Sequence, residues 1–280
     1  MKVLLANKFF YLKGGSERTF FEEAELLKER GHRVIFFSMK DEKNFYSPQA
    51  EYFIDRIDYE SPSRIGRDLS KISKLLYSFE AKKKLEELVI KEKPDIAHLH
   101  NIHHQISPSI IHTLRKHNVP MVMTLHDCKM VCPAYTMTRN GIPCEKCARG
   151  HYFSCLIHRC TKDSYFKSLI NVIEMYLHHR LLRIYEGVDI FITPSRFLRD
   201  KLKGMGFKGK TVVLPNPIDA RNYRPNYNPS RRVFGYFGRL SPEKGLFSLV
   251  EAMENVDADL KIIGDGPLQP QLRRKIETEH

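Results

Sequence analysis

The chain has 280 residues, 42% of them hydrophobic and 28% charged, a composition that excludes disordered and fibrous proteins. This length allows one large or two ordinary domains and excludes a small disulfide-stapled fold. Lys and Arg number 46 against 33 Asp and Glu, and the net charge of +13 favours acidic partners such as nucleotides, anionic lipid head groups or nucleic acid.

The apolar runs are too short for a targeting signal or a membrane-spanning helix. The first run, residues 3–6, is interrupted by Asn7 and Lys8. No later run approaches the roughly 18 residues that a spanning helix needs. We therefore expect a cytoplasmic protein that is at most peripheral at the inner face of a membrane.

The amino-terminal part of the chain alternates apolar strands with amphipathic helices. Strands are expected at residues 3–6, 34–37, 96–99, 121–124 and 190–192. The first helix is expected over residues 20–29 and ends at Gly31. Continuous apolar strands between such helices indicate a parallel sheet covered on both faces. The pattern predicts an α/β fold with a complete, doubly wound, Rossmann-like domain over residues 1–217.

The β-α alternation starts again after a proline-containing tract. The tract begins at residues 215–219 and shows little periodicity, which is typical of an interdomain linker. Beyond it we expect strands at residues 233–237 and 260–263, each followed by a helix. Residues 218–280 thus hold about half of what a doubly wound unit needs to cover both faces of its sheet. The sequence predicts a partial second Rossmann-like domain.

Two loops carry groups that suit a diphosphate. Gly14 and Gly15 lie between the first strand and the first helix, where free backbone N–H groups attract negative charge. A tight turn that needs a positive φ is the alternative interpretation. Arg239 and Lys244 follow the first strand of the second domain, and their charges suit a diphosphate leaving group. The alternative there is a solvated loop with a helix cap.

Six short motifs occur in order along the chain. They are Gly14-Gly15-Ser16-Glu17, Thr124-Leu125-His126-Asp127, Thr193-Pro194-Ser195, Pro215-Asn216-Pro217-Ile218-Asp219, Gly238-Arg239 through Lys244-Gly245, and Ile263-Gly264-Asp265-Gly266-Pro267. Together they resemble glycosyltransferase family 4, whose members are retaining enzymes of the GT-B fold with two facing Rossmann-like domains. The resemblance implies that a sugar is transferred from a nucleoside diphosphate sugar to a glycan or lipid-linked acceptor, in cell-surface polysaccharide biosynthesis. It implies no catalytic metal.

The resemblance also implies roles for individual residues. His126 would contact the donor sugar, and Arg239 and Lys244 would hold the diphosphate; these three are the candidate catalytic residues. The candidate donor-binding residues are Gly14 and Gly15 at the phosphates, with Gly264, Asp265 and Gly266 near the nucleoside. In the same-face mechanism usually drawn for the family, the leaving phosphate takes the proton of the acceptor. On the sequence alone, a histidine at the end of a buried strand is often a hydrogen-bonded core residue.

One family motif is not found in the sequence. Members carry a Glu-x7-Glu motif late in the second domain, and nothing after Gly266 resembles it. The chain reaches His280 before the strands expected to supply that motif. We therefore expect a truncated or split gene product, a deliberately shortened chain, or an inactive relative, with weakened donor binding and doubtful activity alone.

All six cysteines lie within residues 128–160, an insertion in the first domain. In a reducing compartment such clustering suggests a metal before disulfides. The candidate ligands of a structural zinc are Cys144, Cys147, Cys155 and Cys160, and Cys132 could replace one of them. Reduced buried cysteines and disulfides are the alternatives. The insertion is assigned to fold stability or acceptor recognition.

Histidines and basic helices form the remaining patterns. His98, His100, His103 and His104 surround the end of an expected strand. They suit a metal site, although no carboxylate lies among them; lining the cleft or its acceptor side is favoured, and a structural role is the remaining alternative. We expect the His178-His179 pair to be solvated. Residues 64–93 and 164–183 are amphipathic and basic, which suits solvated surface helices or contact with a membrane surface.

Two other functions compete with that of a transferase. A basic, zinc-stabilised nucleic-acid-binding protein agrees with the net charge and the cysteines. It is disfavoured because the basic residues are scattered and no recognition module is readable, so no nucleic-acid partner is expected. A non-catalytic partner of a full-length transferase is the other alternative.

Overall fold

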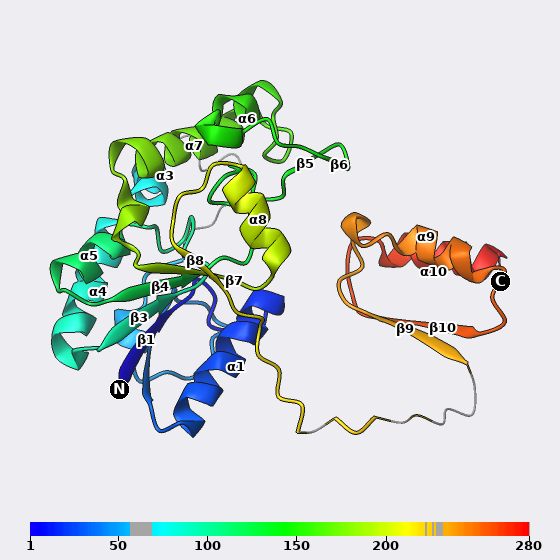
Figure 1. The fold of residues 1–280 in the computed structure, drawn as a ribbon, viewed down its shortest axis with the longest axis horizontal. Helices are drawn as coiled ribbons and strands as arrows, with labels where there is room; N and C mark the ends of the chain where they lie inside the picture. The colour runs from blue at the N-terminus through cyan, green and yellow to red at the C-terminus, as the bar shows by residue number, and fades with distance from the viewer. Residues whose placement is uncertain (57–68, 222, 226, 228–231, 280) are drawn as a thin grey trace. The chain divides into compact units, whose positions relative to one another are not determined.

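The computed structural model describes residues 1–56, 69–221, 223–225, 227 and 232–279 (Figure 1). The chain divides into two compact units, Met1–Asp219 and Ala220–His280. The sequence analysis placed the boundary after Pro217, in the same proline-containing tract.

The first unit is built on a parallel sheet. In the part of the chain that the structure describes, this sheet has six strands in the spatial order β2-β1-β3-β4-β7-β8. Their bounds are β1 (Lys2–Ala6), β2 (Arg33–Phe37), β3 (Ile96–Leu99), β4 (Met121–Thr124), β7 (Ile190–Thr193) and β8 (Thr211–Val213). The chain winds from β1 to β2 on one side and later returns to β3 on the other side of β1. Open α/β sheets bind ligands at the carboxyl ends of strands beside such a reversal.

The predicted α/β fold with a parallel sheet is confirmed, and each strand expected in this unit is present. Strand β8 was not predicted. It is short, lies at the edge of the sheet, and follows Lys208, Gly209 and Lys210, which interrupt the apolar pattern. Pairing with β7 therefore makes it a strand, because its own sequence signal is weak.

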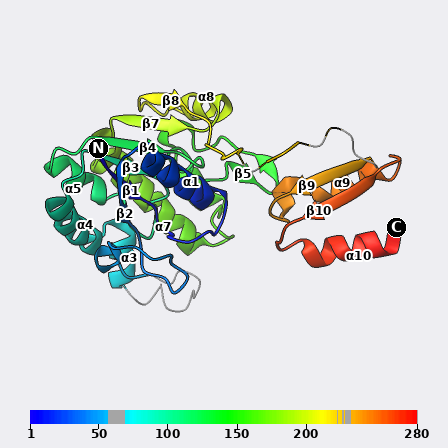
Figure 2. The ribbon, with the colours of Figure 1, turned by 90° about the horizontal axis from the view of Figure 1, so that it is seen from below.

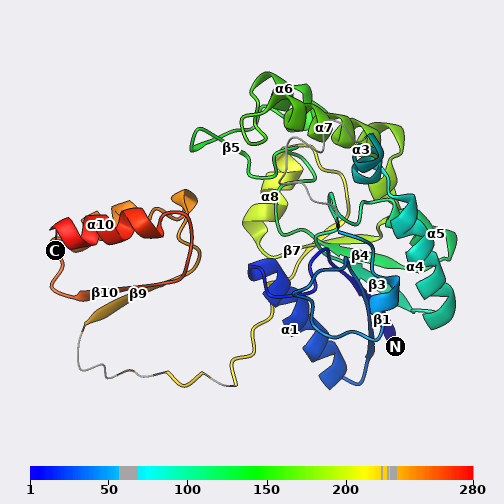
Figure 3. The same cartoon turned by 180° about the vertical axis from the view of Figure 1, so that it is seen from behind.

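Strand β1 divides its side chains between two apolar layers, because successive residues of a strand point to opposite faces. Val3 and Leu5 pack with α1 (Gly15–Glu29), which lies across one face of the sheet (Figure 2). Leu4 and Ala6 join the larger cluster on the other face, where α4 (Phe79–Glu92) and α5 (Ile110–Lys116) lie side by side (Figure 3). This packing fixes the strand ends that carry the polar groups.

Residues 64–93, expected to present one helix face, form two helices in the described part. They are α3 (Leu69–Leu76) and α4, separated at Tyr77 and Ser78. Ser78 ends the continuity because its Oγ accepts a hydrogen bond from Ala81 N at 3.1 Å and caps α4. Residues 64–68, with Arg64 and Arg67, lie outside the described residues.

The remaining elements of the first unit lie within the cysteine-rich insertion or after it, except for one short helix that lies beside α4. They are the hairpin β5 (Thr138–Arg139) and β6 (Ile142–Pro143), the helices α6 (Phe153–Ile157), α7 (Tyr165–Tyr176) and α8 (Arg196–Gly204), short 3-10 helices at Ala50–Tyr52, Ala148–Gly150 and Ile184–Gly187, and a π-helical turn at Leu177–Leu181. Helix α6 packs against α7, which continues into the π-helical turn.

The second unit holds two parallel strands and the helices that follow them. Strand β9 (Val233–Phe237) pairs with β10 (Asp259–Ile263), and the helices are Pro242–Lys244, α9 (Leu246–Met253) and α10 (Gln269–Glu279). Leu246 and Val250 of α9 and Leu272 of α10 form a small buried cluster. The strands and helices predicted for this unit are present.

None of the helices in the described ranges combines the length and the apolar character that crossing a membrane requires.

Candidate functional site

The glycine turn after β1 leaves the start of α1 uncovered. Gly14 is the N-cap of α1, and its φ of −166° is extended backbone that any residue adopts. A turn that needs a positive φ is therefore the wrong explanation for Gly14. Among the described atoms, none lies within 4 Å of a Cβ placed on Gly15. The two glycines thus leave the N–H groups at the helix start accessible to an anion.

Lys8 adds a cation beside this turn. Its backbone N–H donates to Asn101 O at 3.0 Å, which joins the end of β1 to the segment after β3. Its ammonium lies close enough to Asp127, Glu17 and His126 to interact with them electrostatically, and burial lowers the pKa of Lys8. Lys8 is not among the site residues predicted from the sequence. Its signal was its position directly after the first strand of a doubly wound sheet.

His126 lies at the carboxyl end of β4, two residues beyond Thr124. Its Nε2 is 3.0 Å from Nδ1 of His100, which follows β3, and the two rings stack with centroids 5.3 Å apart. Burial, followed by the charges of His98 and Lys8, lowers the pKa of His126 to about 4. The ring is therefore neutral near pH 7 and offers hydrogen bonds without carrying a charge.

His98 and His100 face a carboxylate, contrary to the expectation that none lies among the histidines. Glu23 of α1 pairs with His98 Nδ1 through Oε1, and its Oε2 lies 3.5 Å from His100 Nε2. The other ring nitrogen of His98, Nε2, is 2.7 Å from Thr124 Oγ1. The sequence signal was that Glu23 lies three residues after the buried Phe20, on the same stripe of the helix.

The other two histidines of the group lie in a second buried cluster. His104 Nδ1 is 3.5 Å from Glu174 Oε2, and Lys129 Nζ is 2.7 Å from the same oxygen. His103 Nδ1 is 3.3 Å from the hydroxyl of Tyr185. Burial lowers the pKa of His104 to about 4 and that of His103 well below its usual range. This cluster joins the segments after β3 and β4 to α7, so we assign both histidines a structural role.

The expectation that both His178 and His179 are solvated is wrong for His178, which is buried, whereas His179 is half-buried. His178 is 1% exposed, and its Nε2 lies 2.6 Å from Leu76 O at the end of α3. The ring of His179 lies against Tyr185 with centroids 4.7 Å apart, and burial lowers its pKa to about 3. Both residues belong to the π-helical turn, whose wider register differs from the α-helical spacing used in the sequence analysis.

The cysteines of the insertion are free thiols that lie near one another. Cys147 and Cys155 are buried, and both interact electrostatically with Cys132 and Cys160, while Cys144 lies near Cys147. Burial raises the pKa of Cys147 and that of Cys155 to about 12, so both are protonated near pH 7 in the metal-free protein. Within the described ranges, no three of the sulfurs come within 4.8 Å of one another. A structural zinc on these thiols stays a prediction.

Arg239 and Lys244 of the second unit lie exposed on the loop after β9. Lys244 ends the short helix Pro242–Lys244, and Arg239 precedes this helix. Both charges act on Glu243, whose pKa is lowered first by a hydrogen bond from Ser241 and further by these two cations. The loop therefore presents two cations at the carboxyl end of a parallel strand, the edge at which open sheets bind ligands.

The loop after β10 packs its backbone against the loop after β9. A Cβ on Gly264 would collide with Gly238 O, and one on Gly266 would collide with Leu240 O. Asp265 O accepts a hydrogen bond from Leu240 N at 2.9 Å, and Asp265 Oδ1 accepts one from Gly266 N at 2.7 Å. Close backbone approach thus requires both glycines and holds Asp265 next to the loop that carries the two cations.

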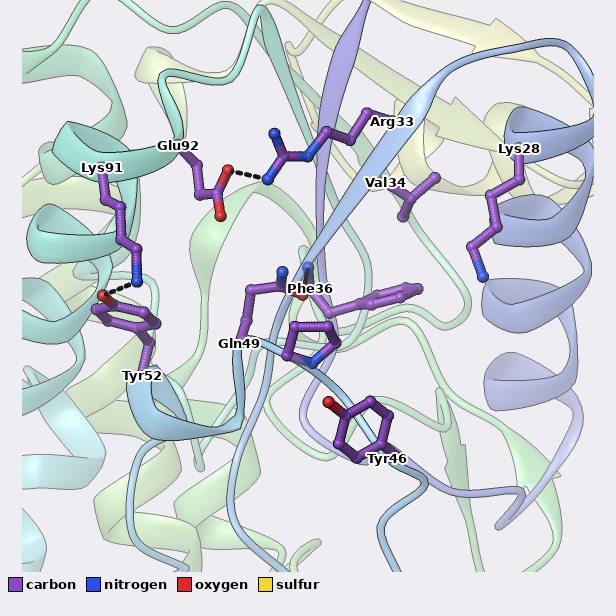
Figure 4. A pocket seen from close by; sticks show the side chains of 10 residues that line it. Lys28, Arg33, Val34, Phe36, Tyr46, Gln49, Tyr52, Lys91 and Glu92 are labelled. Carbon is purple, nitrogen blue, oxygen red and sulfur yellow. Dashed lines mark hydrogen bonds and ion pairs between the residues drawn. The ribbon is translucent and has the colours of Figure 1, made fainter.

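A pocket of about 520 Å³ lies in the first unit, toward the amino ends of the strands and away from the carboxyl ends near His126 (Figure 4). Arg33 at the start of β2 and Glu92 at the end of α4 form an ion pair of 2.7 Å, and Lys91 donates to the hydroxyl of Tyr52 at 3.1 Å. These residues mark the amino ends of the strands. The pocket is therefore separate from the candidate site around His126, which lies at the carboxyl ends.

The fold and the site define the class of protein. The first unit is a doubly wound α/β domain that gathers a glycine turn, a half-buried lysine and a neutral histidine beside the reversal of strand order. Such an edge suits a phosphorylated or nucleotide-bearing ligand.

Comparison with known proteins identifies the family. The chain belongs to glycosyltransferase family 4, because the model described as Glycosyltransferase Family 4 matches residues 13–222. The chain is 25% identical over 260 residues to an uncharacterized 42.6 kDa protein in the cps region of Klebsiella pneumoniae, which covers 88% of this chain and 63% of that protein. The resemblance predicted from the six motifs is confirmed at the level of a family 4 glycosyltransferase.

Solved structures share the fold. Anabaena HepE in complex with UDP superimposes with a TM-score of 0.56 at 16% identity, covering 100% of this chain and 65% of HepE. The lipopolysaccharide outer core galactosyltransferase WaaB in its apo form gives a TM-score of 0.54 at 13% identity, covering 99% of this chain and 65% of WaaB. The fold is that of the GT-B glycosyltransferases with Rossmann-like domains. The chain spans less than two thirds of the length of each of these relatives.

Proposed function

We propose that this chain carries the machinery of a retaining glycosyltransferase, a hexosyltransferase, which moves a sugar from a nucleoside diphosphate sugar to a glycan or lipid-linked acceptor. The observation that carries the proposal is the position of His126 in a family 4 chain. Its neutral ring lies at the carboxyl edge of the first sheet, in the electrostatic reach of Lys8 near the glycine turn.

The diphosphate of the donor is assigned to Arg239 and Lys244 of the second unit, and the glycine turn of the first unit is assigned to phosphate oxygens. Arg239 and Lys244 supply exposed charges at the carboxyl end of β9, and Gly14 and Gly15 leave the start of α1 open to phosphate oxygens. The nucleoside is assigned to the loop Gly264, Asp265 and Gly266, which lies against the cationic loop. The UDP in the HepE structure supports a nucleoside diphosphate as the ligand class.

The chemistry follows from where charge develops. Cleavage of the sugar–phosphate bond leaves negative charge on the departing diphosphate, and positioned cations stabilise that charge. A neutral His126 interacts with the sugar through a hydrogen bond and adds no positive charge beside the developing carbocation. In the same-face mechanism, the leaving phosphate oxygen takes the acceptor's proton, so the proposal needs no protein base and no catalytic metal.

The acceptor and the location are part of the proposal. The Klebsiella relative is encoded in a cps region, and WaaB is a galactosyltransferase of the lipopolysaccharide outer core. Both support an acceptor in cell-surface polysaccharide assembly. We place the reaction in the cytoplasm, peripheral to the inner face of the membrane, where a lipid-linked acceptor is accessible.

Calorimetric titration of the purified chain with UDP, ADP and GDP tests the donor site. One of these nucleotides is expected to bind, and Arg239→Ala or Lys244→Ala is expected to weaken its binding by about 10- to 100-fold, because each removes a charge-assisted hydrogen bond of about 1.5–3 kcal/mol. The matched control is Lys261→Ala, which removes an exposed lysine of β10. If Arg239→Ala and Lys244→Ala bound the nucleotide as tightly as the control Lys261→Ala, the assignment of the diphosphate to this loop would be contradicted.

Slow hydrolysis of the corresponding nucleotide sugar tests the reaction. Proton NMR is expected to show the released sugar first in the anomeric form of the donor, because a retaining enzyme delivers water to the face from which the phosphate departs. His126→Ala is expected to abolish this hydrolysis and leave the affinity for the nucleotide unchanged. Release of the opposite anomer would refute the retaining mechanism.

A further inference from the structure

Three atoms of metal-ligand type converge between α1 and the end of β3. They are Nδ1 of His98, Nε2 of His100 and a carboxylate oxygen of Glu23, and all lie within 4.8 Å of one another. The two histidine side chains are 7% and 0% exposed, and that of Glu23 is 22% exposed. The cluster is thus a shielded site and differs from the exposed acidic groups that are common on protein surfaces.

The outer nitrogens of both rings already have partners. His98 Nε2 lies 2.7 Å from Thr124 Oγ1, and His100 Nδ1 lies 3.0 Å from His126 Nε2. Histidines that bind metals almost always donate their second ring N–H in this way, which fixes the tautomer and directs the lone pair of the other nitrogen at the ion. The second shell expected of a metal site is therefore present at both histidines.

The inner nitrogen of His100 lacks such a partner. Among the described residues, His100 Nε2 is buried and accepts or donates no hydrogen bond, although Glu23 Oε2 lies 3.5 Å away. When His100 donates through Nδ1 to His126, the Nε2 lone pair faces the carboxylate of Glu23, and two acceptors oppose each other. A cation between them removes this repulsion and satisfies both groups.

We propose that Glu23, His98 and His100 bind one divalent cation of the zinc type, with solvent as the fourth ligand. Two imidazole nitrogens and one carboxylate oxygen are a common donor set for zinc, whose neighbouring ligands lie roughly 3.3 Å apart in tetrahedral geometry. The 3.5 Å between His100 Nε2 and Glu23 Oε2 fits this separation. Binding at Nδ1 requires the other tautomer of His98: the Nδ1 proton that faces Glu23 leaves to solvent, Nε2 takes up a proton from solvent, and His98 then donates through Nε2 to Thr124 with no net release of protons.

The cation has a consequence for the neighbouring His126. With His100 Nε2 on the ion, His100 donates through Nδ1, and His126 accepts through Nε2. His126 then carries its own proton on Nδ1. The metal site thus selects one tautomer of His126, and it does so whatever ligand the protein binds. The inference is independent of the proposed transferase function.

Titration of the chelator-treated full chain with Zn²⁺, followed by calorimetry and metal analysis, tests the site. His100→Ala and Glu23→Gln are each expected to lose one equivalent of zinc relative to the wild type. His117→Ala is the matched control, because His117 also pairs with a glutamate, Glu86, at 3.0 Å but belongs to no ligand cluster among the described residues. Zinc held by the cysteines is common to all four proteins, so it does not affect the difference.

Co²⁺ provides a readout that needs no variant. In the proton NMR spectrum of the Co²⁺-loaded wild type, strongly shifted, solvent-exchangeable signals are expected from His98 Nε2–H and His100 Nδ1–H. Their absence, or equal zinc content in the wild type and both site variants, would overturn the proposal. A hydrogen-bonded Glu23, with His98 and His100 donating to it, would then be the correct description of the cluster.

Discussion

Lys129 Nζ lies 2.7 Å from Glu174 Oε2, and their side chains are 4% and 2% exposed. Lys129 follows β4 and its ammonium also donates to Pro133 O at 3.2 Å, whereas Glu174 belongs to α7. This buried ion pair connects the start of the cysteine-rich insertion to α7, the helix that follows the insertion. The segment just before Lys129 carries His126, so the ion pair also helps to hold His126 in position.

Removal of the glutamate should destabilise the first unit strongly. We expect Glu174→Ala to lower the free energy of unfolding by about 3–5 kcal/mol, because it leaves the Lys129 ammonium buried and uncompensated. Urea denaturation measures this change. The control Glu86→Ala breaks the exposed pair with Lys116 and should change the free energy of unfolding far less, because exposed ion pairs contribute little. Similar decreases in the free energy of unfolding of both variants would show that the buried Lys129 ammonium does not need Glu174 as its partner.

The protein should lose stability as the pH falls from 6.5 to about 4. In the folded state the pKa of His104 is lowered from 6.5 to about 4, and burial is the largest cause. The negative charge of Glu174 acts in the opposite direction, whereas the positive charges of Lys129, Lys8 and His178 lower the pKa further. The unfolded chain therefore binds a proton first, so stability is full above pH 6.5 and declines through this window. The pKa of Glu174 is also lowered, which extends the loss at lower pH.

Urea midpoints measured across this range check the dependence on pH. The slope is expected to be shallower in His104→Gln, which removes one of the groups that bind protons on unfolding. Other buried histidines such as His103 and His179 contribute in the same direction, so some slope should remain. A midpoint that is constant from pH 6.5 to 4 would contradict the burial of these rings.

Two glycine variants should separate a ligand-facing glycine from a structural one. A Cβ on Gly15 enters open space at the start of α1, so Gly15→Ala should leave stability unchanged or raise it by up to about 1 kcal/mol. The same methyl group should weaken nucleotide binding, because it covers the helix start. Calorimetry and urea denaturation of one preparation measure both effects.

Gly264→Ala, in contrast to Gly15→Ala, should destabilise the fold of its unit. Its Cβ would collide with Gly238 O, and Gly264 has a φ of 149° that other residues rarely adopt. The loops after β9 and β10 must then separate, and amide hydrogen exchange in both strands is expected to accelerate. Unchanged exchange in Gly264→Ala would mean that the close approach of the two loops is not required for the fold.

The cysteine cluster should bind a second metal ion distinct from the histidine site. If Cys144, Cys147, Cys155 and Cys160 hold zinc, the Co²⁺ derivative should show the charge-transfer absorption of thiolate ligands, which histidine and carboxylate ligands do not give. Cys144→Ser should reduce this absorption, whereas Glu23→Gln should leave it unchanged. A Co²⁺ spectrum without thiolate bands would exclude the zinc and leave buried, protonated thiols.

The local sequence pattern determined the elements and their order. Apolar runs such as that of β1 and the glycine turn at Gly14 are contiguous signals, because strand and helix periodicities depend on residues close in the chain. The family motifs are contiguous as well, so His126, Arg239 and Lys244 could be nominated from the sequence. The sequence did not reveal β8, whose identity as a strand depends on its partner β7.

Tertiary packing decided which polar groups meet. Glu23 reaches His98 and His100 only because α1 covers the face of the sheet beside β3, and the pairing of Lys129 with Glu174 depends on how α7 packs. The burial of His178 and His179 depends on a π-helical turn that α-helical spacing does not anticipate. Thus the sequence alone determined the family, the strands of the first sheet other than β8, and the loops with phosphate-type chemistry. Contacts between distant segments, and the pKa values that follow from burial, required the folded chain, because they arise from packing and not from neighbours in the sequence.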